Sequence, residues 1–432
     1  MNNFNQLLVQ AQIAYDAADW SSLIQYLQQL VLGQNSRHSE IVKNREHILK
    51  LAVSILEMGD FQQRWEVAKV LTSLGNIAIP PLIEILEDED AEEELRWYAA
   101  KILGEFQHPD AIAPLVELLK TDENEELKAI ATTALGQMGN VAITALCELL
   151  TAEDTRLLAV RSLSCIRQPK TITPLLSVVQ DSQAAIRTAA IEALSSFHDE
   201  RVPPVLLIAL DDVAATVRRA AVMGLGFRSD LCAELNLVTR LQPRLYDFNL
   251  EVCCAAAVAL SRMNCDDAAK QLFQVLISSH TPIKLQLEII RALSWMGTTS
   301  GLEYIQQALN HNLSETMWQE IVTVLGRVQK PQLTQQATEI LLEILQSKHP
   351  ATEIVNIKSA IALSLGQLGN IQAIEPLISL LADANASVRL HAIAALKSLD
   401  KEVAYQQLQQ LANNATLTPD LQTGVVIALA EW

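Results

Sequence analysis

A short segment of apolar, basic and small residues recurs along most of the chain. It reads VRRAAVMGLG at 217–226, and the same pattern returns as LRWYAAKILG at 95–104 and VRLHAIAAL at 388–396. A second segment, built on Pro-Leu followed by a Leu pair, precedes each copy, as in IPPLIEIL at 79–86 and EPLISLL at 375–381. Its prolines recur every 29 to 33 residues, at Pro81, Pro114, Pro174 and Pro204, with Ala145 in the intervening position. Two helical segments in each period of this length are typical of a helical solenoid.

The repeat predicts an all-α fold, a right-handed α-solenoid (superhelix) of two-helix repeats. Residues 61–432 contain about eleven helix pairs, separated by turn signals such as Gly75-Asn76 and Gly139-Asn140. Residues 1–60 do not match the repeat, and we expect them to form an N-terminal helical cap, because terminal units of solenoids are commonly atypical. The unit around 225–250 is longer than the others, with one helix expected over 230–244.

Composition restricts the partners. The net charge is −18, which disfavours nucleic acid as the main partner. No apolar run approaches 18 residues, so the sequence predicts a chain that does not span a membrane. The first residues lack a basic segment followed by an apolar core, and the six cysteines then fit reduced thiols. The sequence therefore predicts a cytoplasmic protein.

One position of the second helix of each pair, seven residues before a recurrent Leu, is usually basic. Seven residues are about two helical turns, so these side chains keep one angular position along the stack. We expect them to bond loop carbonyls or acidic residues, with Asp88, Asp122, Asp181, Asp212 and Asp383 as candidate acceptors; an anion-binding groove is the alternative. The residues at this position are Arg64, Arg96, Lys128, Arg156, Arg187, Arg218, Cys253, Gln286, Trp318, Lys358 and Arg389.

The basic line is interrupted at Cys253, Gln286 and Trp318. Cys253 and Cys254 stand where the preceding unit has Arg218 and Arg219, and Trp318 later takes the same position. Free cysteines usually pack as small buried hydrophobes. Thiolate chemistry or contact with a metal or cofactor, together with Cys232 or Cys265, is the alternative interpretation. The sequence contains no CxxC motif, which would be the stronger signal for a metal site.

Aromatic residues follow two of the basic positions. Trp65 comes after Arg64, and Trp97 and Tyr98 come after Arg96, one repeat later. We expect these residues near the concave surface, where Trp65, Arg96, Trp97, Tyr98 and Trp318 would bind a protein partner. Packing between units is an alternative because Trp is usually largely buried. Stacking of a flat tetrapyrrole on these rings is a third interpretation.

Common catalytic motifs are missing from the sequence. It contains no GxGxxG, P-loop, HExxH or GxSxG segment, and its eight histidines are scattered. These observations favour a protein that holds other proteins and does not catalyse a reaction, and they identify neither catalytic nor metal-ligating residues.

The recurrent segments resemble HEAT repeats over roughly residues 61–432. More narrowly, RWYAAKILGEF at 96–106 and VRRAAVMGLG resemble the HEAT-like repeats of cyanobacterial phycobilin lyases and phycobilisome proteins. A HEAT protein that partners an A-type iron–sulfur carrier belongs to the same group of relatives. The resemblance implies a scaffold, adaptor or chaperone whose partner is a phycobiliprotein, a phycobilisome component or an iron–sulfur carrier.

The same resemblance implies a catalytic alternative. In it the chain is a bilin lyase subunit that helps attach a tetrapyrrole to a cysteine of a phycobiliprotein, and a second HEAT chain is expected as its companion. The cofactors that the resemblance implies are a bilin or a shared iron–sulfur cluster.

Overall fold

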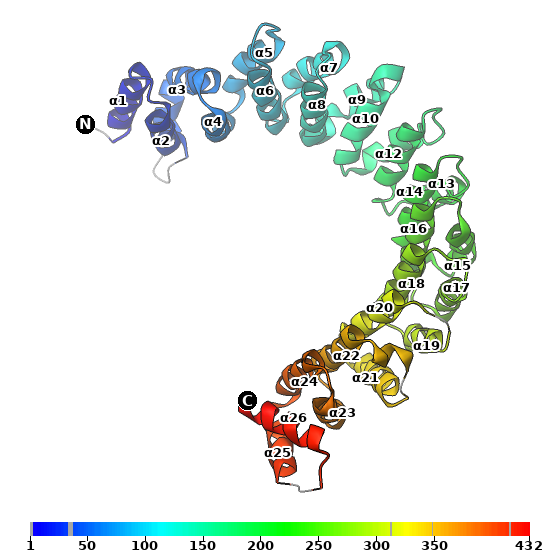
Figure 1. Ribbon diagram of the computed structural model, residues 1–432. Coiled ribbons are helices and arrows are strands. Elements are labelled where there is room, and N and C mark those ends of the chain that lie inside the picture. Colours follow the sequence, from blue (N-terminus) through cyan, green and yellow to red (C-terminus); the bar gives the residue numbers. More distant parts are fainter. Residues whose placement is uncertain (1–2, 33–37, 312, 348, 414–415) are drawn as a thin grey trace. The chain divides into compact units, whose positions relative to one another are not determined.

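A computed structural model describes residues 3–32, 38–311, 313–347, 349–413 and 416–432. Every regular element in these residues is a helix, which confirms the predicted all-α class. The chain divides into two compact units, Met1–Val205 and Leu206–Trp432. Within each unit the helices follow one another in series as a solenoid, as Figure 1 shows. The right-handed sense of the superhelix stays a prediction.

The first unit begins with three helices that precede the regular pairs. α1 packs on α2, and both α2 and α3 pack on α4. From α5 onward, outer helices alternate with inner helices, and in this unit the outer helices are the shorter ones. The helices of this unit are α1 (Asn3–Asp16), α2 (Trp20–Val31), α3 (His38–Met58), α4 (Phe61–Leu74), α5 (Ile79–Glu87), α6 (Glu93–Glu105), α7 (Ile112–Thr121), α8 (Glu125–Met138), α9 (Ile143–Leu149), α10 (Glu153–Cys165), α11 (Ile172–Leu176) and α12 (Ala184–Leu194).

The second unit continues the alternation to the last described residue. α13 (Val202–Ala209) spans the sequence boundary between the units. The remaining helices are α14 (Ala215–Gly226), α15 (Leu237–Leu241), α16 (Leu250–Ser261), α17 (Asp266–Leu276), α18 (Ile283–Trp295), α19 (Thr299–Ala308), α20 (Glu315–Gly326), α21 (Pro331–Gln346), α22 (Val355–Leu368), α23 (Ile374–Ser379), α24 (Ala386–Leu399), α25 (Lys401–Ala412) and α26 (Pro419–Ala430).

Inner helices pack directly on the inner helices of the neighbouring pairs. α6 contacts α8, α14 contacts α16 and α22 contacts α24, while each outer helix also covers its own inner helix. The buried residues are mostly Ala, Leu, Ile and Val, such as Leu103, Ala134 and Leu135, which are all fully or almost fully buried. Small and aliphatic side chains allow this close approach of helices.

The Leu-Gly ending of the inner helices has a steric reason. A Cβ added to Gly104 of α6 would lie 2.7 Å from the Cα of Ala134 on α8. A Cβ on Gly366 of α22 would lie 2.8 Å from the Cα of Ala395 on α24. Glycine at this position therefore lets consecutive inner helices touch through their backbones.

The long unit around 225–250 differs from the expectation. The predicted single helix over 230–244 is replaced by two short 3-10 turns, Ser229–Leu231 and Gln242–Tyr246, with α15 between them. Asn236 adopts a left-handed conformation (φ 51°) immediately before α15, and Pro243 opens the second turn. Left-handed backbone and a proline that lacks an N–H both interrupt a continuous helix.

One segment of the described residues, Glu125–Leu149, is long and apolar enough to cross a membrane by length and composition. Half of its most apolar stretch is buried inside the fold. Gly139, with φ 67°, separates the segment into α8 and α9. This segment therefore serves as part of the helical core.

Candidate partner-binding site

The basic line on the inner helices is bonded within the chain. Arg64 is 5% exposed; its Nε donates to the carbonyl of Leu56 at 3.0 Å, and its Nη1 lies 2.7 Å from a carboxylate oxygen of Glu94. Arg389 donates to the carbonyl of Asp383 at 2.8 Å. These side chains donate hydrogen bonds as predicted. The accepting carbonyls lie near the end of the preceding helix or in the turn before the donor's own helix.

For several of these cations, the carboxylate that pairs with them comes from the following repeat. Arg96 lies 2.9 Å from Asp122, although Asp88 stands in its own turn. The same step along the solenoid joins Arg156 to Asp181 at 2.8 Å, Arg218 to Asp247 at 2.6 Å and Lys358 to Asp383 at 2.5 Å. Each pair therefore ties one inner helix to the next turn.

The aspartates in these pairs also organise their own turns. Asp247 accepts a hydrogen bond from the backbone N–H of Asn249 at 2.9 Å. The hydrogen bond from Arg218 lowers the pKa of Asp247 further than burial raises it, and Asp247 in turn raises the pKa of Arg218. Arg96, predicted to bind a partner, is similarly engaged, since its side chain and that of Asp122 are each 12% exposed. The basic line thus joins neighbouring repeats, and its charge is largely paired with carboxylates of the same chain.

The aromatic residues lie on α4 and α6. Trp65 is 42% exposed, and the ammonium of Lys101 lies 4.1 Å above its ring. Trp97 is half-buried and meets Tyr98 edge-to-face at 5.2 Å between ring centres. Tyr98 is fully buried, and its hydroxyl donates to the carbonyl of Phe61 at 3.0 Å. Of the three aromatic residues predicted on these two helices, Trp65 and Trp97 reach the surface, and Tyr98 is buried against Phe61 and Trp97.

A hollow of about 340 Å³ lies beside Trp97, between α4, α6 and the start of α8. Its apolar wall includes Phe61, which is 61% exposed, and Leu127. Three carboxylates, Glu93, Glu94 and Glu126, line the rest together with Asn124 and Tyr98. Phe61 and Glu126 were not predicted from the sequence as site residues, whereas Glu93 and Glu94 belong to the acidic run 87–94, whose charge suits a basic partner. A signal for Phe61 was present, because Phe61 is one helical turn before Trp65.

The predicted residues of the second unit do not belong to this hollow. Trp318 lies on α20 and meets His349 edge-to-face at 5.3 Å. Its indole Nε1 is buried and has no hydrogen-bond partner among the described residues. Trp318 is half-buried, and its role in binding a partner stays a prediction.

The two adjacent cysteines are poorly placed for thiolate chemistry. Cys253 is 5% exposed, and its Sγ donates to the carbonyl of Asp247 at 3.1 Å. Burial raises the pKa of both the Cys253 and Cys254 thiols. Cys232 and Cys265 lie close enough to interact: burial raises the pKa of the Cys232 thiol, and the charge of Cys265 raises it further. Within the described residues, no group of three or more His, Cys, Asp or Glu side chains is arranged to hold a metal ion.

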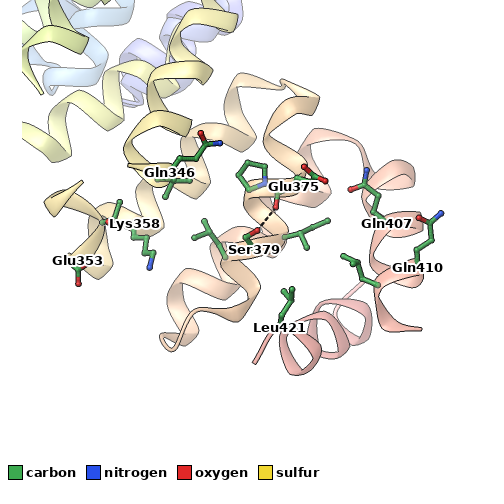
Figure 2. A pocket seen from close by; sticks show the side chains of 14 residues that line it. Gln346, Glu353, Lys358, Glu375, Ser379, Gln407, Gln410 and Leu421 are labelled. Carbon is green, nitrogen blue, oxygen red and sulfur yellow. Dashed lines mark hydrogen bonds between the residues drawn. The ribbon is translucent and has the colours of Figure 1, made fainter. Parts of the chain in front are cut away.

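A larger groove of about 1140 Å³ lies in the second unit, among α21, α23, α25 and α26. Figure 2 shows Glu375 and Gln407 on facing sides of it, with Gln410 and Leu421 nearby. The ammonium of Lys358 at its edge is already paired with Asp383. The remaining lining is mostly amide and aliphatic, and the sequence contains no motif that marks it.

Comparison with protein families adds a match to the HEAT repeats family. The model of this family matches residues 79–157, 151–226 and 353–430, which together make up more than half of the chain. This match agrees with the resemblance seen in the sequence and with the alternating outer and inner helices.

A curated relative is the phycocyanobilin lyase subunit alpha of Synechococcus elongatus (strain ATCC 33912 / PCC 7942 / FACHB-805). It is 36% identical over 98 residues, which cover 21% of this chain and 36% of the relative. The matched part therefore spans about a third of the length of the lyase subunit.

Solved structures with a similar fold include importin beta and a karyopherin. Importin beta superposes with a TM-score of 0.51 at 13% identity, over 97% of this chain and 63% of its own. The karyopherin Kap121p, solved bound to the extreme C-terminus of the protein phosphatase Cdc14p, gives a TM-score of 0.54 at 13% identity, over 99% and 58%. At such low identity these similarities support the solenoid fold alone.

Proposed function

The chain belongs to the HEAT repeats family, and from this premise we propose that it is a non-catalytic scaffold or adaptor for a protein partner. We assign the partner to the phycobiliproteins or other phycobilisome components, because the relative with 36% identity is a phycocyanobilin lyase subunit. In this proposal the partner binds to α4 and α6 of the first unit.

The observation that carries the proposal is the distribution of exposed groups on the inner helices. The basic side chains are engaged in ion pairs between neighbouring repeats, as for Arg96 and Asp122. Trp65 and the neighbouring Phe61 remain exposed by 42% and 61%. Large aromatic side chains at a surface supply much of the binding energy in protein interfaces. Because these two aromatics lie one helical turn apart on α4, they form a compact anchor for a partner.

Binding of purified phycocyanin subunits, measured by isothermal titration calorimetry, tests the proposal. We expect a defined stoichiometry and at least a tenfold loss of affinity in Trp65→Ala, the size of a typical interface anchor. Trp295→Ala is the matched control, because Trp295 is a 69% exposed Trp on inner helix α18. Absence of binding to both phycocyanin subunits, or equal losses in the two variants, would refute this assignment.

The lyase match favours a second candidate function, a bilin lyase subunit. Its matched segment covers only about a third of the lyase subunit, and such lyases are expected to work with a second HEAT chain. Incubation with phycocyanobilin, apo-phycocyanin and a companion lyase subunit tests it. A covalent bilin on the phycocyanin band of a denaturing gel would support the lyase candidate. Phycocyanin that binds without acquiring a bilin would favour the scaffold.

A further inference from the structure

We propose that the hollow between α4, α6 and α8 binds the cationic side chain of an Arg or Lys within a basic segment of the partner. This inference rests on the proposed function, since it names the chemistry that the partner presents to the same face. The hollow has a volume of about 340 Å³, which lies at the small end of the range for ligand pockets and suits one long side chain.

Two carboxylates at the hollow are available for a cation from outside. Glu94 is already 2.7 Å from Arg64, and the nearby Lys128 is 3.2 Å from Glu125. Glu93 and Glu126 have no ion-pair partner among the residues that the structure describes, and both are exposed. Two carboxylates beside a partly apolar wall attract a positive charge more strongly than they would in open solvent.

The aromatic wall supplies the second half of the recognition. Trp97 and Phe61 line the hollow, and aromatic faces attract Lys and Arg cations. A neutral apolar side chain would contact the rings and leave Glu93 and Glu126 unpaired. A cation satisfies both the rings and the carboxylates, so the lining favours Arg or Lys over an aliphatic residue.

The neighbouring repeat contains an internal version of this contact. Trp65 on α4 is covered by Lys101 from α6, the next inner helix, at 4.1 Å. Thirty-two residues further, Trp97 takes the place of Trp65, and Thr133 on α8 takes the place of Lys101. The hydroxyl of Thr133 is short and bonds to the carbonyl of its own helix at 2.9 Å. Across the described part of the chain, each cation–ring contact lies on another aromatic residue, so Trp97 has no cation of its own.

A fluorescein-labelled peptide of alternating arginine and glycine tests the inference by fluorescence anisotropy at low ionic strength. The double variant Glu93→Gln/Glu126→Gln removes the two unpaired charges and should weaken peptide binding about five- to tenfold. The control is Glu315→Gln/Glu402→Gln, which makes the same charge change at exposed residues in the first turns of α20 and α25. We expect less than about a twofold change in this control, because any general effect of net charge is shared.

A peptide in which citrulline replaces arginine keeps the shape of the side chain and removes its charge. Weak binding of the citrulline peptide, with selective loss in Glu93→Gln/Glu126→Gln, supports the hollow as a cation site. Equal losses in the test and control variants, or equal binding of the two peptides, overturns it. Matching thermal melts confirm that both variants are folded. Because the peptide replaces phycocyanin, these results are independent of whether phycocyanin is the partner, and calorimetry with phycocyanin decides that separately.

Discussion

Replacing Arg218 with alanine is expected to loosen the second unit at α14 and α16. The guanidinium of Arg218 donates to both carboxylate oxygens of Asp247, at 2.6 and 2.7 Å, and to the carbonyl of Asp212 at 2.8 Å. The side chains of Arg218 and Asp247 are only 13% and 4% exposed. The alanine variant therefore leaves a nearly buried carboxylate without its main partner.

The expected cost follows from these contacts. Removing one partner of a buried ion pair costs about 3–5 kcal/mol. The lower end applies, because Asp247 keeps its hydrogen bond from Asn249 and has Arg244 at 3.9 Å. A loss of about 3 kcal/mol raises the population of locally opened molecules by roughly 150-fold. Hydrogen exchange of peptides from α14 and α16, followed by mass spectrometry, measures this change directly.

The effect should depend on pH in a defined direction. The pKa of Asp247 is lowered in the fold, chiefly by Arg218, so its ionised form stabilises the folded state. This stabilisation is complete above the ordinary Asp pKa of about 3.9 and is lost as the pH falls toward the lowered folded value. The difference between wild type and Arg218→Ala should therefore be full at pH 6 and shrink below about pH 4.

The pair of Arg201 with Asp199 supplies the control. Arg201 lies 2.8 Å from Asp199 but its side chain is 47% exposed, so the pair is open to solvent. Arg201→Ala should leave hydrogen exchange nearly unchanged, because exposed ion pairs contribute little. If hydrogen exchange in α14 and α16 rises less than about threefold in Arg218→Ala, the role assigned to the ion pairs between neighbouring repeats is refuted.

Three further predictions address packing and thiol reactivity. Gly104→Val should lower the free energy of unfolding by about 2–3 kcal/mol in urea denaturation, because its Cβ would lie 2.7 Å from the Ala134 Cα; an unchanged midpoint would contradict the backbone contact. Tyr98→Phe should cost about 1 kcal/mol in the same assay, since it removes one hydrogen bond, and a neutral result would show that water replaces it. Iodoacetamide should label the exposed Cys165 well before Cys253, because burial shields Cys253 and raises its pKa; mass spectrometry that finds equal rates would disprove this order.

Much of the fold could be predicted because each repeat encodes its own helices. The recurrent segment at 95–104 lies within α6 (Glu93–Glu105), since its apolar spacing and flanking turn signals are local. The helix expected over 230–244 was wrong in detail, because Pro243 and the left-handed Asn236 break it. Single residues with special backbone requirements are easily overlooked in a pattern that spans many repeats.

The site was only partly predictable. The 32-residue spacing of Trp65 and Trp97 placed both on one face of consecutive inner helices. Tyr98 follows Trp97 but is rotated by about 100° around the helix, which turns it into the core. The meeting of Phe61, Glu93 and Glu126 depends on how three helices pack, which one sequence does not specify. The pairing of each basic residue with the aspartate one unit later has the same origin.

The most direct test of the account is a hydrogen-exchange footprint of the protein with and without bound phycocyanin. If the partner binds at Trp65 and Trp97, we expect slower exchange in peptides covering α4 and α6, which carry these residues. Exchange around Trp295 on α18 should be unchanged. Complex formation with protection confined to other helices, and none in α4 or α6, would contradict it.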